Sequence, residues 1–331
     1  LVARVGPTVK DLMGLTGTTA QGGFRNSCIL KPLWFWRLDS SGFPDLLRPM
    51  PTTLSVIAPG LLGASVAQAA RRYGVADRIK VWARRPEVRL TLKDVDWCDE
   101  VCDSSSAAAE GGDIVVVCTP VDRIVPLIHE ISSALGPTAI VTDVGSVKGE
   151  ICRLAAASLT NGAQFVGSHP MAGSEKSGME HATPDLFQDR PCFVTPLDTT
   201  PPEPVDRIVS FWDRIGSRVV TMHPDKHDEI VARISHLPHL VASALCSLLG
   251  QLDPTSHLYA GGGLRDTTRV AGGSPDLWLE ILLENRDEVL RALGAYQEEV
   301  QHLRSALANR DTQQLLGLSL IHISEPTRPT T

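Results

Sequence analysis

The sequence lacks the features of several protein classes. It has no excess of basic residues, since its formal net charge is −7, whereas nucleic-acid binders usually carry a basic face. No window reaches the roughly 18 uninterrupted apolar residues of a membrane-spanning helix. Its seven cysteines are an odd number spread widely, which is typical of reduced thiols in a cytoplasmic protein. The 331 residues, 43% of them hydrophobic, suit one large or two medium globular domains.

A metal site is also missing from the pattern. Cys98 and Cys102 form a single close pair, and neither a second pair nor a histidine stands beside them, although structural zinc needs four ligands. Histidines are dense in the region from residue 223 to residue 239, but no cysteine or clear third ligand accompanies them: His223, His227, His236 and His239. Pro224 and Pro238 are expected to interrupt the helix that carries them. We therefore expect no metal.

Both ends of the chain differ from the rest. Residues 1–50 show no period and do not begin with Met, so Met50 is a candidate start, with a transit peptide as the alternative. The final SLIHISEPTRPTT follows a predicted helix and resembles translated sequencing-adapter DNA. We expect a doubtful extension over 1–50, an α/β domain over 51–202, a helical domain over 203–316 and an artefactual tail over 317–331.

Strands and helices alternate in the first of these domains. Apolar strand candidates occupy residues 54–58, 78–83, 113–120, 138–144, 163–169 and 191–196. Helical spacing lies between them, from Gly60 to Tyr73 and from Val121 to Leu135. This order predicts a doubly wound, mainly parallel sheet of the Rossmann type. The strand signals fade after about residue 203, and an all-helical C-terminal domain is expected there.

The last helical segment, from Pro275 to Gln314, has an apolar seam. Its members follow one another at spacings of 4, 3, 4, 3 and 4: Val289, Leu293, Tyr296, Val300, Leu303 and Leu307. Such an a/d spacing is typical of helices that pack along their length. The seam packs either on the same domain or on a partner subunit, and spacing alone does not separate the two.

The stretch LSVIAPGLLGAS predicts a dinucleotide-binding turn between the first strand and the first helix. The usual pattern is G-x-G-x-x-G, and its positions are filled here by Ala58, Gly60 and Gly63. Gly60 lets the backbone approach a pyrophosphate, and Gly63 allows close packing of helix on strand. The free N–H groups at the helix start then hold the phosphates. We take Gly60, Leu61, Leu62 and Gly63 as cofactor-binding residues.

An acidic residue is missing at the end of the second strand, where NAD-binding proteins commonly bind the ribose. Ala83 stands there and is followed by Arg84 and Arg85. A guanidinium pairs well with a 2′-phosphate, so NADP is favoured over NAD; the alternative is that both arginines are surface charges. Thr119 and Pro120 follow the strand at 113–120 and are further cofactor-binding candidates, because ligands bind at the carboxyl ends of parallel strands.

Two polar residues end neighbouring strands. Ser146 follows TDVG at the start of a predicted helix, where it is expected to act as the N-cap, with Glu150 or a nearby group completing the cap. His169 ends the strand at 163–169 within VGSHPMAGSEKSG. A histidine there either forms a structural hydrogen bond or serves as a general base. The surrounding glycines and serines leave its ring accessible to a ligand.

Several longer motifs together resemble the prephenate/arogenate dehydrogenase family. These are DIVVVCTPV, TDVGSVKG, GSHPMAGSEKSG, HDEIVARISHLPH and GGGLRDTTRVAGGSPDLWLEILLENRD, in that order over residues 54–310. The resemblance implies a Rossmann domain, a helical dimerisation domain, a homodimer and an NADP- or NAD-dependent oxidation. It also implies that His169 is the base, that Ser146 orients it and that Arg269 binds a substrate carboxylate. Further substrate-binding residues implied are Glu175, Asp266, His239 and Trp278.

The implied reaction converts prephenate to 4-hydroxyphenylpyruvate, or arogenate to tyrosine, with loss of carbon dioxide. From the residues alone, an ion pair with Asp266 three positions earlier is the preferred explanation of Arg269. A β-hydroxyacid dehydrogenase is an alternative enzyme, although that chemistry usually relies on a lysine from the helical side. A non-catalytic NADP-binding sensor is a third alternative.

Overall fold

The computed structural model describes residues 52–173 and 178–319. The expected N-terminal extension, Met50, Glu175 and the chain after residue 319 lie outside the described residues. Within them, helix α13 (Thr312–Ser319) continues past residue 316, where the artefactual tail was expected to begin.

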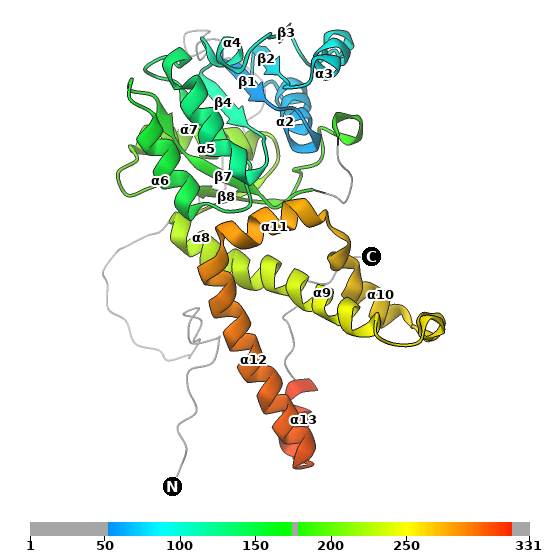
Figure 1. The fold of residues 1–331 in the computed structure, drawn as a ribbon. Coiled ribbons are helices and arrows are strands. Elements are labelled where there is room, and N and C mark those ends of the chain that lie inside the picture. The colour runs from blue at the N-terminus through cyan, green and yellow to red at the C-terminus, as the bar shows by residue number, and fades with distance from the viewer. Residues whose placement is uncertain (1–51, 174–177, 320–331) are drawn as a thin grey trace, which may run out of the picture. The chain divides into compact units, whose positions relative to one another are not determined.

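A six-stranded parallel sheet forms the centre of the first part of the chain (Figure 1). Its strands are β1 (Thr53–Ile57), β2 (Arg78–Trp82), β3 (Glu100–Val101), β4 (Ile114–Val117), β5 (Ile140–Asp143) and β6 (Gln164–Phe165). Their order is β3-β2-β1-β4-β5-β6, and all five neighbouring pairs are parallel. This order, which reverses between β1 and β4, confirms the predicted doubly wound Rossmann fold.

Helices cover both faces of this sheet because side chains alternate along each strand. Leu54 and Val56 of β1 pack in one apolar cluster with α2 (Leu61–Arg72) and α7 (Pro202–Arg214). Ile57 packs in a second cluster, where α4 (Ser105–Ala109), α5 (Val121–Ile131) and α6 (Gly149–Ser158) lie. Strands β1 and β4 are buried on both sides, which explains the continuous apolar run at 114–117.

The single strand expected at residues 163–169 is wrong. Val166 N donates to Val141 O beside the parallel sheet, but the chain then turns away at Gly167. Strand β7 (Gly167–Pro170) belongs to a second sheet, antiparallel to β8 (Pro191–Thr195), which pairs in parallel with β9 (Arg218–Thr221). An extended apolar pattern does not reveal a change of partner strand. The change places His169 opposite Phe193.

The α/β part was expected to end at residue 202, yet α7 and β9 follow that position. Phe211 and Trp212 of α7 are buried in the cluster on one face of the parallel sheet, and β9 pairs with β8. We therefore propose that the boundary between the two parts lies near residue 222, after β9.

The rest of the described chain is helical, as predicted (Figure 1). Its helices are α8 (Pro224–Val231), α9 (Leu237–Leu249), α10 (Gly262–Thr268), α11 (Pro275–Glu284), α12 (Arg286–Ala308) and α13. Pro238 does not interrupt the helix. A π turn, Ala232–His236, comes directly before it and accommodates a residue that has no backbone N–H to donate. The helix Pro224–Leu249 is the one described helix long and apolar enough to cross a membrane by composition.

The apolar seam of α12 is only partly covered. Val289 is buried and Leu293 and Leu303 are half-buried, whereas 41% of Val300 and 65% of Leu307 are exposed. Packing within the described chain therefore covers the start of the seam and leaves much of the rest exposed, Val300 and Leu307 above all.

Candidate active site

The glycine-rich turn has the geometry that a pyrophosphate needs. Gly60 precedes the first residue of α2, and a Cβ atom there would meet open space. At Gly63, a Cβ atom would lie 3.0 Å from Ala58 O and 3.1 Å from the Cβ of Cys118, so only glycine fits between α2 and β4. The backbone N–H groups of Leu61 and Leu62 open the helix and have no intrahelical acceptor. They offer the donors that a phosphate takes at such an end.

Ala58 occupies the first glycine position of the pattern with a φ of +66°. This left-handed conformation costs an alanine roughly 1–2 kcal/mol. It is held by Ala58 N donating to Trp82 O at 2.8 Å and Gly60 N donating to Ala58 O at 2.9 Å. The turn therefore keeps the shape of a glycine turn although its first residue carries a methyl group.

Arg84 and Arg85 are exposed at the end of β2, next to the turn. Arg85 lies 3.8 Å from Glu87 with both side chains about two-thirds exposed, so its guanidinium is accessible. Arg89 donates from its Nη1 to Ala83 O at 2.7 Å and to Arg84 O at 3.1 Å. Arg89 thus fixes the backbone that presents the two arginines.

Thr119 and Pro120 follow β4 at the same edge of the sheet. Pro120 precedes the first residue of α5. The Oγ1 atom of Thr119 is buried and has no hydrogen-bond partner among the described residues. An unpaired buried hydroxyl is costly, so a bound group that contacts it at this edge would satisfy it. The turn, the free helix start and this hydroxyl together fit a dinucleotide.

His169 lies on β7 and is nearly buried, with 8% of its surface exposed. Its Nδ1 is 2.9 Å from Nε2 of His227, and Nδ1 of His227 is 2.8 Å from Oδ1 of Asp228. Burial holds the pKa of His169 well below its usual range, and the neighbouring His227, Lys148 and His236 lower it further. His169 is therefore neutral at neutral pH, the form that can accept a proton.

Asp228 also holds the start of α6. Its Oδ1 accepts from Lys148 N at 2.8 Å, and its Oδ2 accepts from Gly149 N at 2.7 Å. The expected N-cap role of Ser146 is therefore wrong, because α6 begins only at Gly149 and its free N–H groups are bound from α8. Ser146 is half-buried in the loop before the helix, and within residues 52–173 and 178–319 it forms no hydrogen bond with His169.

A buried ion pair supports the loop between β5 and α6. Lys148 Nζ contacts Oδ2 of Asp143, and neither side chain is exposed to solvent. Asp143 also accepts from Gly145 N at 2.9 Å and, through Oδ1, from Ser168 N at 3.1 Å. These bonds tie β5 to the residue before His169. Removing either partner leaves a buried unpaired charge, which costs about 3–5 kcal/mol.

The helical part adds a second group of aromatic rings. His239 stacks on Trp278 with ring centroids 3.6 Å apart, and its Nδ1 donates to Val270 O at 2.8 Å. His236 meets the edge of the same indole. Asn285 joins both groups, because its Nδ2 is 3.1 Å from Nδ1 of His236 and donates to Asp228 O at 3.0 Å.

Arg269 and Asp266 lie beside these rings in sequence but are exposed. Arg269 begins the 3₁₀ helix Arg269–Gly272, directly before Val270, which binds His239. The ion pair considered as an alternative for Arg269 and Asp266 does not form within the described ranges. The structure thus leaves the side chain of Arg269 exposed, one residue before the carbonyl that binds His239.

Sequence reasoning missed the roles of His227, Asp228 and Asn285. His227 and His236 were noticed only for their density, as metal ligands, and no metal-binding group of three side chains occurs among the described residues. The dipeptide His227-Asp228 at the start of a predicted helix was the available signal. Its partners lie 58 and 80 residues away along the chain, so no local pattern reveals them.

Comparison with known proteins decides the family. The model of the prephenate dehydrogenase nucleotide-binding domain matches residues 66–221, and that of the prephenate dehydrogenase dimerization domain matches residues 223–318. The chain belongs to the prephenate/arogenate dehydrogenase family. A cyclohexadienyl dehydrogenase of Zymomonas mobilis is 33% identical over 80% of this chain and 91% of its own length.

Two more members of the family agree. A prephenate dehydrogenase of Bacillus subtilis is 31% identical over 81% of this chain and 74% of its own. The crystal structure of prephenate dehydrogenase from A. aeolicus, in complex with hydroxyphenyl propionate and NAD+, is 31% identical, with a TM-score of 0.75 over 82% of this chain and 95% of that one. The resemblance stated from the motifs is confirmed, and the first part of this dehydrogenase is a nucleotide-binding domain that takes NAD or NADP.

Proposed function

We propose that the protein oxidises prephenate to 4-hydroxyphenylpyruvate and carbon dioxide, in the biosynthesis of tyrosine. The observation that carries this proposal is the buried, neutral His169, whose Nδ1 is bound to His227. Because Nδ1 of His169 is bound to His227, the other ring nitrogen, Nε2, is available to accept a hydrogen bond from a substrate hydroxyl. The membership of the family supports the choice of substrate.

The reaction needs a base, a hydride acceptor and a cation for an anionic substrate. His169 Nε2 takes the proton of the 4-hydroxyl as the C4–H bond breaks. The glycine-rich turn would hold the dinucleotide, which would supply the hydride acceptor. Arg269 binds a carboxylate, for which its planar fork is suited. The family resemblance adds His239, Trp278, Asp266 and Glu175 as further substrate-binding residues. The family resemblance gives the orientation of the base to Ser146, which is not hydrogen-bonded to His169 among the described residues. Carbon dioxide leaves with the ring's aromatisation, which makes the step irreversible.

The first test is absorbance at 340 nm with purified protein, offering prephenate and arogenate in turn with NADP and NAD. We expect reduction with prephenate, and loss of that reduction in His169→Asn. Turnover of arogenate alone would reassign the substrate to the compound that gives tyrosine directly. Tight cofactor binding without turnover of either compound would indicate a non-catalytic sensor.

We propose NADP as the preferred nucleotide. The end of β2 offers no carboxylate at Ala83 and presents the exposed Arg84 and Arg85. A guanidinium pairs with the 2′-phosphate that distinguishes NADP, whereas the ribose hydroxyl of NAD gains less from it. The parts that the two nucleotides share are bound by the glycine-rich turn and by the residues after β4: Gly60, Leu61, Leu62, Gly63, Thr119 and Pro120.

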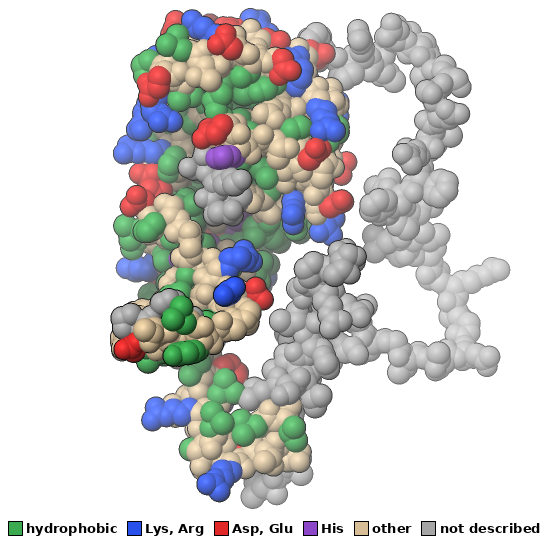
Figure 2. Space-filling model, turned by 90° about the vertical axis from the view of Figure 1, so that its right-hand side faces the viewer, with side chains coloured by type: hydrophobic (Ala, Val, Ile, Leu, Met, Phe, Trp, Pro, Cys, Tyr) green, Lys and Arg blue, Asp and Glu red, His purple; other side chains and the backbone are tan. Residues whose placement is uncertain are grey.

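We also propose a homodimer formed through the helical part, in the cytoplasm. Large apolar side chains are exposed on α9, α11 and α12, among them Leu248, Leu279, Leu283, Leu290 and Leu307. Figure 2 shows apolar side chains among the charged ones on the lower, helical part of the molecule. Apolar patches of this kind mark protein interfaces, and the matching family model is a dimerization domain. Light scattering should give a mass near 71 kDa, about twice 35.7 kDa.

A further inference from the structure

Three side chains form a continuous hydrogen-bonded chain inside the protein. It runs from His169 Nδ1 to His227 Nε2 over 2.9 Å, and from His227 Nδ1 to Asp228 Oδ1 over 2.8 Å. His227 has no exposed side-chain surface, and Phe193 packs edge-on against its ring. Water therefore does not compete for either nitrogen of His227, and the chain has one ordered path.

The direction of this chain is fixed at its Asp228 end. A carboxylate only accepts, and the oxygens of Asp228 accept from Lys148 N, Gly149 N and His227 Nδ1. Neutral His227 then carries its proton on Nδ1, which leaves Nε2 as an acceptor. His169 must donate to that acceptor, so its own proton is on Nδ1 and its Nε2 is free.

We infer that Asp228 is a positioning residue that, through His227, holds His169 in the tautomer whose Nε2 can accept a proton. The inference rests on the proposed function for its catalytic meaning. When His169 Nε2 takes the proton of the substrate hydroxyl, the imidazolium gains a positive charge. That charge is shared along the chain, because the proton on Nδ1 is bound by His227 and the proton of His227 is bound by the anionic Asp228.

Other charged groups lie near the hydrogen-bonded side chains His169, His227 and Asp228, and they make the negative charge of Asp228 more important. Lys148 and His236 disfavour a positive charge on His169, while Asp143 is paired with Lys148. For His227, hydrogen bonding to Asp228 is the main influence that raises its pKa, against the lowering by burial. Asp228 is the one carboxylate among the described residues that is bonded directly to either ring of the chain. Without it, proton acceptance would place a charge beside Lys148 with no direct counter-ion.

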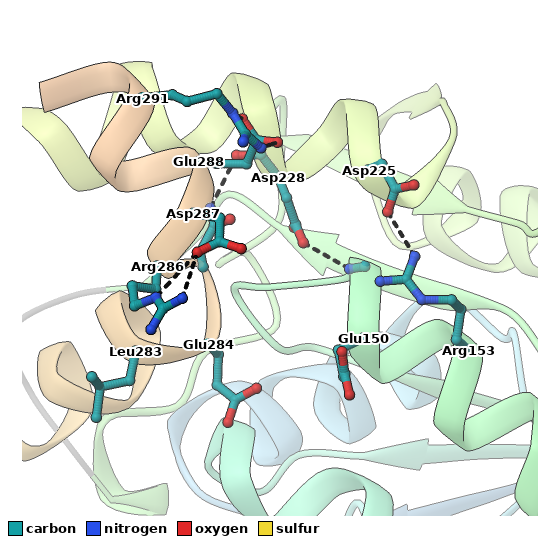
Figure 3. Close-up of a pocket in the computed structure, with 12 residues that line it drawn as sticks. Glu150, Arg153, Asp225, Asp228, Leu283, Glu284, Arg286, Asp287, Glu288 and Arg291 are labelled. Atoms are coloured by element: carbon teal, nitrogen blue, oxygen red, sulfur yellow. Dashed lines mark hydrogen bonds and ion pairs between the residues drawn. The ribbon is translucent and has the colours of Figure 1, made fainter. Parts of the chain in front are cut away.

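The far side of Asp228 opens on a pocket of about 550 Å³ (Figure 3). Asp228 points from α8 toward the start of α6, and 10% of its side chain is exposed there. Asp225 lines the same pocket but pairs with Arg153 at 2.8 Å and with the exposed His223 at 3.7 Å, and it bonds to neither His169 nor His227. It is therefore a matched control: an aspartate on the same helix, facing the same pocket, outside the hydrogen-bonded chain.

The first experiment is NMR of the imidazole nitrogens of the full-length protein at neutral pH, with His169→Asn used to assign the His169 signals. We expect His169 and His227 both protonated on Nδ1 and not on Nε2. A His169 that carries its proton on Nε2 overturns the inference. This measurement needs no substrate, so it stands even if neither prephenate nor arogenate is turned over.

Kinetics then test the catalytic consequence. Asp228→Asn should lower kcat by about 100-fold, the low end of what general-base catalysis supplies, with a KM changed far less and a larger solvent isotope effect on kcat. Asp225→Asn should keep both at the wild-type value. Because Asp228 also caps α6, His227→Phe serves as a second variant that breaks the chain and leaves that cap in place. Wild-type kcat in folded Asp228→Asn or His227→Phe contradicts the inference.

Discussion

The imidazole of His239 lies flat on the indole of Trp278, with ring planes 6° apart and centroids 3.6 Å apart. Val270 O accepts a hydrogen bond from His239 Nδ1, so the stack and the hydrogen bond together fix the ring. Nε2 of His239 is left as the acceptor, with Ser243 Oγ 3.5 Å away. A ring fixed on one face and at one edge is suited to bind a substrate without first losing mobility.

We predict that Trp278→Leu weakens substrate binding more than it slows the reaction. Loss of a stacking pair worth about 0.5–1.5 kcal/mol corresponds to a KM raised by about 2- to 10-fold, with kcat close to wild type. Steady-state kinetics at saturating cofactor measure both. Trp97→Leu, in the core of the α/β part, should lower stability and leave KM unchanged. An unchanged KM in Trp278→Leu would remove Trp278 from the substrate site.

Ala58→Gly should stabilise the protein by about 1 kcal/mol, because glycine adopts a φ of +66° without steric cost. For a protein of this size the melting temperature should rise by about 2–4 °C. Ala67→Gly is the matched control, since Ala67 is buried within α2 and the same change there should destabilise. Calorimetry of both variants measures the contrast, and a destabilised Ala58→Gly would refute the strain at this turn.

Arg84→Ala combined with Arg85→Ala should raise the KM for NADP by about 10-fold or more and that for NAD by much less. The loss corresponds to a charge-assisted hydrogen bond of about 1.5–3 kcal/mol. Arg78→Ala is the control, because Arg78 lies at the opposite end of β2 and pairs with Glu100. Equal rises for the two nucleotides would contradict the proposed NADP preference.

Stability should fall as the pH drops below about 6.5, in part because of His236. Burial lowers its pKa from 6.5 to about 4, so below pH 6.5 the unfolded state binds a proton that the folded state does not. The stabilisation is present above the unfolded pKa and is lost as the pH falls through the folded one, by about 3 kcal/mol in total. Urea unfolding at pH 7 and pH 5 should show a smaller loss for His236→Gln than for wild type.

The sequence was sufficient for the parts of the fold that local patterns encode. Apolar runs and helical spacing gave the parallel sheet and the helical part, and the position of Gly60 and Gly63 gave the cofactor turn. His169 stood out because a titratable ring followed a strand and preceded a polar, glycine-rich loop. Each of these features depends on residues that are neighbours along the chain.

What the sequence did not reveal depends on distant partners. The change of sheet between β6 and β7 happens within one extended segment, and only the pairing of His169 with Phe193 exposes it. Ser146 has the residue type of an N-cap, but Asp228 takes that role from 80 residues away. The role of His227 likewise arises only when α8 meets β7, and that of Asn285 only when it reaches Asp228 and His236. From spacing, His227 was considered as a metal ligand and set aside, and Asn285 was not noticed.

Asp228 caps α6 from outside its own part of the protein, and this has a consequence for how the molecule unfolds. If the helical part detached, α6 would lose the acceptor for Lys148 N and Gly149 N, and two N–H groups at its start would be left without a partner. Unfolding of the helical part therefore destabilises α6, a helix of the nucleotide-binding part. Melting of the two parts is accordingly coupled, and a fragment cut at residue 222 would start with a weakened α6.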